Sequence, residues 1–163
     1  MARSVLLSRW SFAAFGVAVT AAMLPGVASA NPAKKVPYWA SISADEARMR
    51  VGPSLDYPSN WIYRRRDLPV KVVQTLGNWR KIEDSDGTQG WMHVRLLSDT
   101  QTAIVTGGVS PLRKAPNEAA DILFRVQPGV VGRLSDCRDG WCRFDTHGQR
   151  GFVQTKALWG GAK

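Results

Sequence analysis

Two cysteines, Cys137 and Cys142, carry the clearest covalent chemistry in this sequence. They flank the segment Arg138-Asp139-Gly140-Trp141, in which Asp-Gly is a strong signal for a two-residue hairpin turn of type I′. In such a hairpin the cysteines face each other as a non-hydrogen-bonded pair with Cα atoms about 4.5 Å apart, within the range of a disulfide. We therefore predict a disulfide between them. A metal-binding or redox-active pair is the alternative, although the spacing is not Cys-x-x-Cys and no second pair accompanies it.

General acid–base catalysis has few candidate groups in this chain. Its two histidines are His93, at the end of an expected strand, and His147, in an expected turn. No nucleophile elbow or other catalytic motif is present, and the regular oxygen-ligand spacing of a calcium loop is absent from the acidic cluster of Glu83, Asp84 and Asp86. We therefore predict that the protein is not an enzyme, binds no cofactor and holds no metal ion.

Aromatic side chains offer more material for a binding site. Tyr57 and Trp61 lie in or beside the long loop that follows Pro53, and loops on a rigid scaffold commonly carry binding residues. Aromatic faces stack on sugar rings or peptide planes, and their polar tips find ligand partners. We predict a groove formed by Tyr57, Trp61 and Trp91. Core packing is the better explanation for the indole rings of Trp79 and Trp141.

The densest positive charge is the run Arg64-Arg65-Arg66. In a strand, Arg64 and Arg66 share one face and Arg65 the other. Guanidinium groups form paired hydrogen bonds with carboxylates and phosphates, so the run predicts a site for an anionic ligand. A solvated edge strand that uses charge against aggregation explains the run equally well.

Short strands must position these side chains. Apolar and polar residues alternate along residues 68–74 and 79–82, as in a strand with one buried face. Gly77 and Asn78 mark the turn between these segments, residues 84–87 mark a second turn, and residues 90–92 form a further short strand. The sequence therefore predicts an all-β fold with no helix longer than one turn.

The same pattern occurs twice along the chain. Residues 48–97 align with residues 111–158 at offsets of 61 to 63, and the offset changes at loops. The alignment places Trp79 on Trp141 and Val70 on Val131. We predict two units, at residues 37–98 and 102–160, each curled into a small barrel that avoids exposed strand edges.

Three motifs of the first unit are informative in combination. They are Arg50-Val51-Gly52-Pro53-Ser54 followed by Tyr57-Pro58, the strand Asn78-Trp79-Arg80-Lys81-Ile82, and the segment from Asp84-Ser85-Asp86-Gly87 to Gly90-Trp91-Met92-His93. Together they resemble the exported tandem proteins of the bacterial SH3-like family, and the match extends into the second unit through Gly140-Trp141-Cys142. The second unit departs from the pattern at Arg113-Lys114-Ala115-Pro116, which lacks the glycine and the Tyr-Pro pair. The resemblance implies a five-stranded barrel in each unit and a binding role, commonly at the cell envelope or on peptidoglycan.

Residues 1–30 have the layout of a secretory signal peptide. A positively charged start precedes an apolar run from Ser11 to Leu24, and Ala28-Ser29-Ala30 supplies small residues for cleavage after Ala30. The apolar run has about 14 residues, whereas a bilayer-spanning helix needs roughly 20. We therefore predict a periplasmic or secreted protein without stable membrane insertion. An uncleaved membrane anchor is the alternative.

The net charge bears on the class of partner. The 163-residue chain has a formal net charge of +9, and removal of residues 1–30 leaves 20 Lys and Arg against 13 Asp and Glu, or +7. Basic charge and aromatic residues are typical of nucleic-acid binding, but an exported protein rarely meets nucleic acid, so we do not predict such a partner. The leading hypothesis is a non-catalytic module that binds peptidoglycan or an envelope protein through Tyr57, Trp61, Trp91 and the arginine run. The second is a structural or signalling adaptor that binds a partner's peptide.

Overall fold

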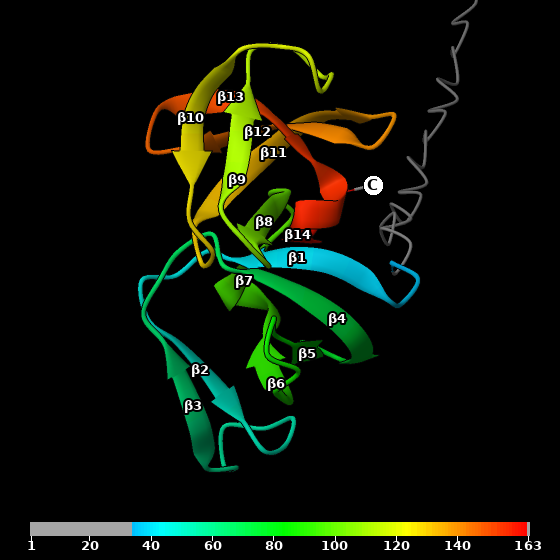
Figure 1. Ribbon diagram of the computed structural model, residues 1–163. Coiled ribbons are helices and arrows are strands. Elements are labelled where there is room, and N and C mark those ends of the chain that lie inside the picture. The colour runs from blue at the N-terminus through cyan, green and yellow to red at the C-terminus, as the bar shows by residue number, and fades with distance from the viewer. Residues whose placement is uncertain (1–33, 163) are drawn as a thin grey trace, which may run out of the picture. The chain divides into compact units, whose positions relative to one another are not determined.

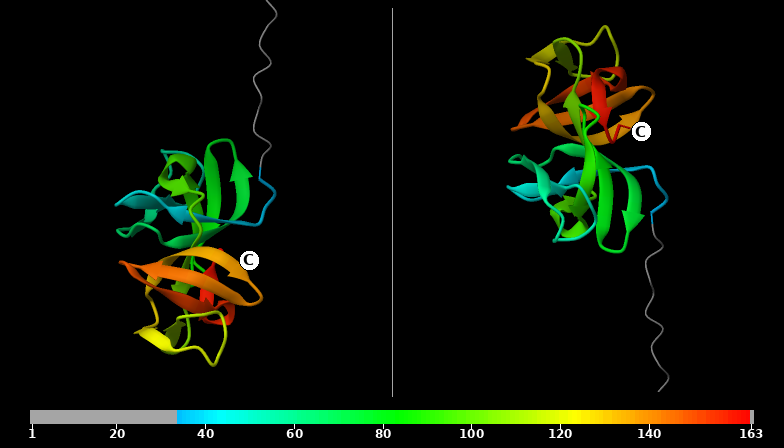
Figure 2. Two further views of the ribbon diagram at one scale, coloured as in Figure 1. Left: turned by 90° about the horizontal axis from the view of Figure 1, so that it is seen from above. Right: turned by 90° about the horizontal axis from the view of Figure 1, so that it is seen from below.

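The computed structural model describes residues 34–162, which fold into two antiparallel sheets with almost no helix (Figure 1). Residues 38–98 build the first sheet and residues 102–160 build the second, so the blue and red ends of the colour range belong to different sheets (Figure 2). The predicted all-β fold is confirmed, with seven strands in each sheet.

Both repeats use the same succession of elements. The first contains β1 (Tyr38–Ile42), β2 (Ala47–Arg50), β3 (Ser59–Tyr63), β4 (Pro69–Leu76), β5 (Trp79–Glu83), β6 (Gln89–His93), the 3₁₀ turn η1 (Val94–Leu96) and β7 (Leu97–Ser98). The second contains β8 (Thr102–Val105), β9 (Ser110–Arg113), β10 (Ile122–Val126), β11 (Val131–Arg138), β12 (Trp141–Thr146), β13 (Gln149–Gln154), the 3₁₀ turn η2 (Thr155–Ala157) and β14 (Leu158–Gly160). The strand order is β3-β2-β6-β5-β4-β1-β7 in the first sheet and β10-β9-β13-β12-β11-β8-β14 in the second.

The pairing registers relate the two repeats residue by residue. The pairs Lys71–Glu83 and Val72–Ile82 of β4 and β5 correspond to the pairs Arg133–Asp145 and Leu134–Phe144 of β11 and β12. Val70 is therefore equivalent to Gly132, and its alignment with Val131 is wrong by one residue. Because side chains alternate between the two faces of a strand, a one-residue shift changes which residue faces the core.

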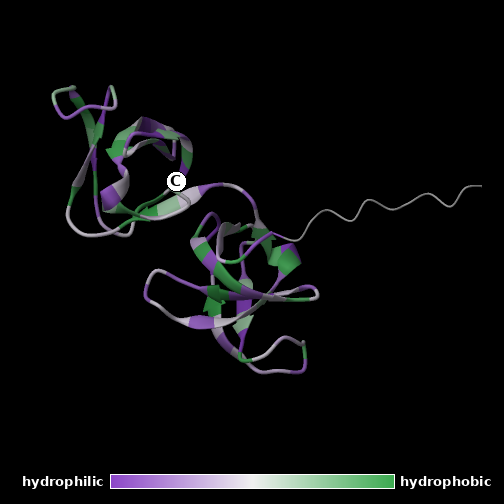
Figure 3. Cartoon of the chain, turned by 90° about the vertical axis from the view of Figure 1, so that its right-hand side faces the viewer, coloured by the Kyte–Doolittle hydropathy of each residue, from purple (hydrophilic) through white to green (hydrophobic). Residues whose placement is uncertain are grey.

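Each sheet packs around its own hydrophobic core. Figure 3 shows hydrophobic and hydrophilic residues interspersed along the strands, as expected where one face of a sheet is buried. The most deeply buried side chains of the first core include Ile42, Met49, Val70, Val72, Ile82 and Met92. Those of the second include Val105, Leu112, Cys142, Phe144 and Val153. Where the first core holds Val70 and Ile82, the second holds Gly132 and Phe144.

The hairpin between β11 and β12 forms as predicted. Arg138 pairs with Trp141, and the two turn residues, Asp139 and Gly140, have φ angles of 50° and 78°, as a type I′ turn requires. Cys137 and Cys142 form a disulfide with Cα atoms 4.1 Å apart. The predicted disulfide is therefore confirmed.

The predicted signal peptide, residues 1–30, lies outside the residues that the structure describes. Among the described residues, no helix has the length and apolar character needed to cross a membrane.

Candidate functional site

The structure places the three aromatic residues of the predicted groove at separate positions. Trp61, which is 54% exposed, lies in β3 opposite the buried Met49. Trp91 lies in β6 opposite Arg50, which follows Met49 in β2. Neighbouring residues of a strand point to opposite faces, so Trp61 and Trp91 lie on opposite faces of the sheet. The Tyr57 ring instead packs over Gly52 in the loop between β2 and β3.

Trp91 belongs to a row of side chains across the outer face of the first sheet. Arg50 of β2 pairs with Trp91 on one side, and Lys81 of β5 pairs with it on the other. In the next row of β5 and β6, the ring of Trp79 meets that of His93 edge to face, with centroids 5.4 Å apart. Trp79 and His93 also line a hollow of about 180 Å³ whose other lining residues include Arg50, Leu55 and Arg95.

The second sheet presents the same arrangement. Phe152 of β13 pairs with Arg113 of β9 on one side and with Arg143 of β12 on the other. Trp141 pairs with Gln154 in the next row, and both line a hollow of about 350 Å³ that also contains Arg113, Glu118 and Lys156. Trp79 and Trp141 therefore line hollows on the outer faces, and their prediction as core residues is wrong. We call these two surfaces the cation–aromatic faces. The first is defined by Arg50, Trp79, Lys81, Trp91 and Arg95, and the second by Arg113, Trp141, Arg143, Phe152 and Lys156.

The faces differ in the wall that the long loop contributes. In the second repeat, Glu118 accepts a hydrogen bond of 2.7 Å from Gln154 Nε2 across the hollow. Leu55 and His93 line the corresponding places in the first repeat. At this position of the long loop the first hollow therefore has an apolar side chain where the second has a carboxylate, and the carboxylate that lines the first hollow is that of Glu46.

The cations of the cation–aromatic faces form no ion pair within residues 34–162. They are Arg50, Lys81, Arg95, Arg113, Arg143 and Lys156, and none of them lies within 4.0 Å of a carboxylate oxygen there. Aromatic rings with adjacent unpaired cations suit an anionic ligand that also has a flat or apolar part. Sequence reasoning missed all six cations, although the alternation in residues 48–50 and 79–82 indicates which of them point outward.

A sequence profile described as bacterial SH3 domain matches the chain twice, at residues 43–99 and 107–160. The chain belongs to the bacterial SH3 domain family. The family assignment inferred from the motifs is therefore confirmed, in two tandem copies.

Two solved structures are similar to this chain over most of its length. NlpC2 and NlpC1 from Trichomonas vaginalis are 13% and 15% identical to the chain, each with a TM-score of 0.35. The matches cover 78% and 83% of this chain, and the chain spans about half the length of those structures, 49% and 50%. No curated protein matches the chain.

Two of the three arginines in the run Arg64-Arg65-Arg66 form ion pairs with acidic residues of the first bacterial SH3 domain. Arg64 Nε lies 3.6 Å from Glu46 Oε2, and Arg66 Nε lies 2.6 Å from Asp45 Oδ1. The Arg66 guanidinium holds the pKa of the Asp45 carboxyl below its ordinary value. Both pairs are exposed, so they contribute little to stability, but they compensate charge. Arg65 differs, because it donates to the backbone carbonyl of Gly129 in the second repeat at 3.2 Å.

The long loop is closed by equivalent hydrogen bonds in both domains despite different sequences. Arg50 Nη1 donates to Tyr57 O at 2.6 Å, and Arg113 Nη1 donates to Ala120 O at 2.7 Å. A backbone hydrogen bond closes each loop, from Val51 to Pro58 and from Lys114 to Asp121. The missing glycine and Tyr-Pro pair therefore do not remove the loop from the second domain.

We expect Gly52→Ala to destabilise the first domain by about 1–2 kcal/mol, because a Cβ at this position would lie 2.6 Å from the Tyr57 ring. The equivalent positions in the second domain are Ala115 and Ala120, so an extra methyl group there faces a smaller side chain. Tyr57→Ala should therefore remove most of the cost of Gly52→Ala, and Ala115→Gly should have little effect. Urea unfolding of the four variants checks this. An equal cost of Gly52→Ala with and without Tyr57 would contradict the packing argument.

Proposed function

We propose that this protein is an exported, non-catalytic binding module of the cell envelope, and that its two cation–aromatic faces bind peptidoglycan. The observation that carries the proposal is the repeated row in which one ring lies between two cations: Trp91 between Arg50 and Lys81, and Phe152 between Arg113 and Arg143. Peptidoglycan offers both sugar rings and stem-peptide carboxylates. The rings of the faces stack on the former, and the guanidinium and ammonium groups pair with the latter.

The histidines support a binding role rather than catalysis. His93 Nδ1 accepts a hydrogen bond from Arg95 N at the start of η1, and its ring packs against Trp79. His147 Nδ1 lies 3.2 Å from the hydroxyl of Thr146. Neither imidazole lies within hydrogen-bond distance of a Cys, Asp or Glu side chain among the described residues, so the usual arrangement of an activated nucleophile is not assembled there.

The test of this proposal is retention on purified sacculi at about 0.15 M salt, where charges more than about 8 Å apart are screened. We expect protein starting at Asn31 to be retained, and the double variant Lys81→Gln/Arg143→Gln to bind about tenfold more weakly, because each substitution removes a charged hydrogen-bond donor. Arg64→Gln/Arg66→Gln is the matched control. It removes the same number of charges from residues that are already ion-paired, and it should change retention less than twofold.

The control also tests the arginine run as a ligand site. Equal losses in the two double variants would indicate general electrostatic attraction and overturn the assignment to the faces. A loss confined to Arg64→Gln/Arg66→Gln would support the arginine run instead. No retention of the unsubstituted protein would overturn the proposed peptidoglycan ligand.

An adaptor that binds a partner's peptide is the second candidate, and the edge strand β10 favours it. Ile122, Leu123 and Phe124 are consecutive and 40%, 47% and 37% exposed, and β10 pairs with a neighbour on one side only. A free strand edge with apolar side chains can add a peptide strand. A specific co-purifying protein released by Leu123→Lys, without retention on sacculi, would favour this function.

A further inference from the structure

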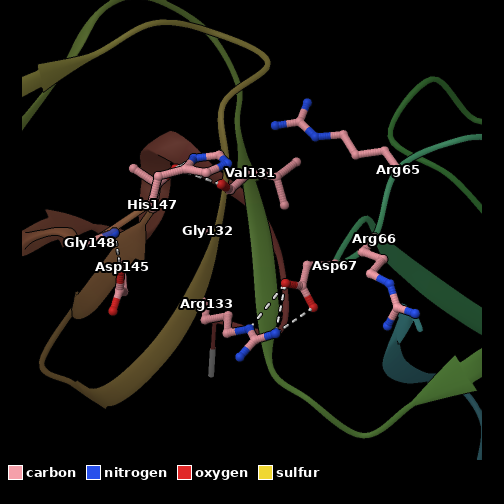
Figure 4. Close-up of a pocket in the computed structure, with 10 residues that line it drawn as sticks. Arg65, Arg66, Asp67, Val131, Gly132, Arg133, Asp145, His147 and Gly148 are labelled. Carbon is pink, nitrogen blue, oxygen red and sulfur yellow. Dashed lines mark hydrogen bonds and ion pairs between the residues drawn. The ribbon is translucent and has the colours of Figure 1, made fainter. Parts of the chain in front are cut away.

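A polar groove lies where residues of the two repeats meet. Arg65, Arg66 and Asp67 of the first repeat and residues 131–133 and 145–148 of the second line a hollow of about 440 Å³ (Figure 4). A second hollow of about 350 Å³ adjoins it, since Arg65, Thr146 and His147 line both. Arg125, Gln127 and Gln149 extend the second hollow with one cation and two neutral amides. The groove is thus built from both repeats and is lined mainly by hydrogen-bonding groups.

Positive charge remains in this groove after the internal ion pairs are counted. Its lining contains four arginines against two aspartates. Arg66 pairs with Asp45, and Arg133 pairs with Asp67 at 3.0 Å. The other lining carboxylate, Asp145, pairs with Arg150 and carries a pKa below its ordinary value, chiefly because of that hydrogen bond. Among residues 34–162, Arg65 and Arg125 are the lining cations without a carboxylate partner.

The two unpaired arginines come from different repeats and line the same hollow. Arg65 is positioned by its hydrogen bond to Gly129 O, and Figure 4 shows it extending toward the side of the pocket that carries His147. His147 is oriented by Thr146, whose hydroxyl donates to Val131 O at 3.0 Å and therefore accepts from His147 Nδ1. The groove thus combines two guanidinium groups with an oriented imidazole.

We propose that this groove binds the phosphate group of a phosphorylated sugar or polyol, with Arg65 and Arg125 holding the phosphate. A phosphate monoester carries close to two negative charges at neutral pH, which matches the two unpaired guanidinium groups, whereas a carboxylate carries one. Guanidinium geometry also suits bidentate contact with phosphate oxygens. The amides of Gln127 and Gln149 supply partners for the hydroxyl groups of the attached sugar or polyol. This site is separate from the cation–aromatic faces and does not depend on them.

The experiment is a titration of isotope-labelled protein, residues 31–163, with glycerol 3-phosphate at constant ionic strength, followed by amide NMR shifts. We expect saturable shifts at residues 129–133 and 146–149, and the same residues should respond to inorganic phosphate. Glycerol and acetate are the matched ligand controls and should produce no saturable shift there. Arg65→Gln and Arg125→Gln should each weaken binding about tenfold or more, because each removes a charge-assisted contact.

Matched variants distinguish a phosphate held by these two guanidinium groups from general attraction to a basic protein. Arg65→Gln also removes a contact between the repeats, whereas no polar contact of Arg125 within the described residues is lost in Arg125→Gln. Arg138→Gln removes one charge from an exposed residue of β11 that belongs to neither the groove nor the cation–aromatic faces, and it should change glycerol 3-phosphate binding less than twofold. Equal weakening by Arg125→Gln and Arg138→Gln, saturable binding of acetate, or absence of binding would overturn the proposal. Binding to phosphatidylglycerol vesicles without a response to glycerol 3-phosphate would assign the phosphate to a lipid and also overturn it. Sacculi retention is measured separately, so either proposal can fail alone.

Discussion

Phe144→Ala is expected to destabilise the second bacterial SH3 domain by about 3–5 kcal/mol, the range observed when a fully buried phenylalanine is truncated. Phe144 is completely buried in β12 and is the largest fully buried side chain of the described residues. Its ring also lies over Gly132, which has no side chain that could fill the resulting cavity. Much of a small domain's stability would therefore be lost. Chemical unfolding of protein starting at Asn31, followed by tryptophan fluorescence, measures the change.

Ile82→Ala is the matched control for this prediction, because Ile82 occupies the equivalent position in the first domain and is also completely buried. We expect a smaller loss of about 2–4 kcal/mol, since fewer buried atoms are removed. A loss below about 1 kcal/mol for Phe144→Ala would show that the second core is not packed around this ring.

The second large effect is expected for Gly132→Val, which gives the second domain the residue that the first has at position 70. A Cβ on residue 132 would lie 2.5 Å from Phe144 Cζ and 2.8 Å from the backbone oxygen of Asp145. Overpacking of a full core costs about 1–3 kcal/mol and more where the neighbours cannot move. We expect about 3 kcal/mol, because both neighbours belong to the same strand of the core.

Combining Gly132→Val with Phe144→Ile tests whether a clash with the Phe144 ring causes this destabilisation. The double variant reproduces the Val70 and Ile82 combination of the first domain, so it should be more stable than Gly132→Val alone by at least about 1 kcal/mol. The same unfolding assay gives the coupling free energy between the two positions. Simple additivity of the two single substitutions would mean that the ring and residue 132 are not in conflict.

Local sequence signals predicted the parts of the fold that depend on neighbouring residues. The Asp139-Gly140 turn placed Cys137 opposite Cys142, because a two-residue turn determines the register of its hairpin. Alternation of apolar and polar residues predicted the strands, and self-similarity predicted the two copies. Local signals did not predict that Gly132 and Phe144 replace Val70 and Ile82 in the second core. The alignment placed Val70 on Val131, and this match of two valines concealed a one-residue shift in strand pairing.

The candidate sites, like the fold, were only partly predictable from the sequence. The sequence was sufficient to identify Trp91 and Arg65 as residues of interest and to predict a family of binding domains. Only the tertiary structure separated Trp61 from Trp91, paired Arg64 and Arg66 with acidic residues far from them in the chain, and left the cations beside Trp91 and Phe152 unpaired. The physical reason is that the sequence reveals only the number of charges. The electrostatic field at a ligand depends on which of these charges the fold brings within ion-pair distance of one another. Among residues 34–162, Arg64 and Arg66 of the arginine run are paired with carboxylates, whereas the cations of the cation–aromatic faces, and Arg65 and Arg125 of the groove, have no carboxylate partner.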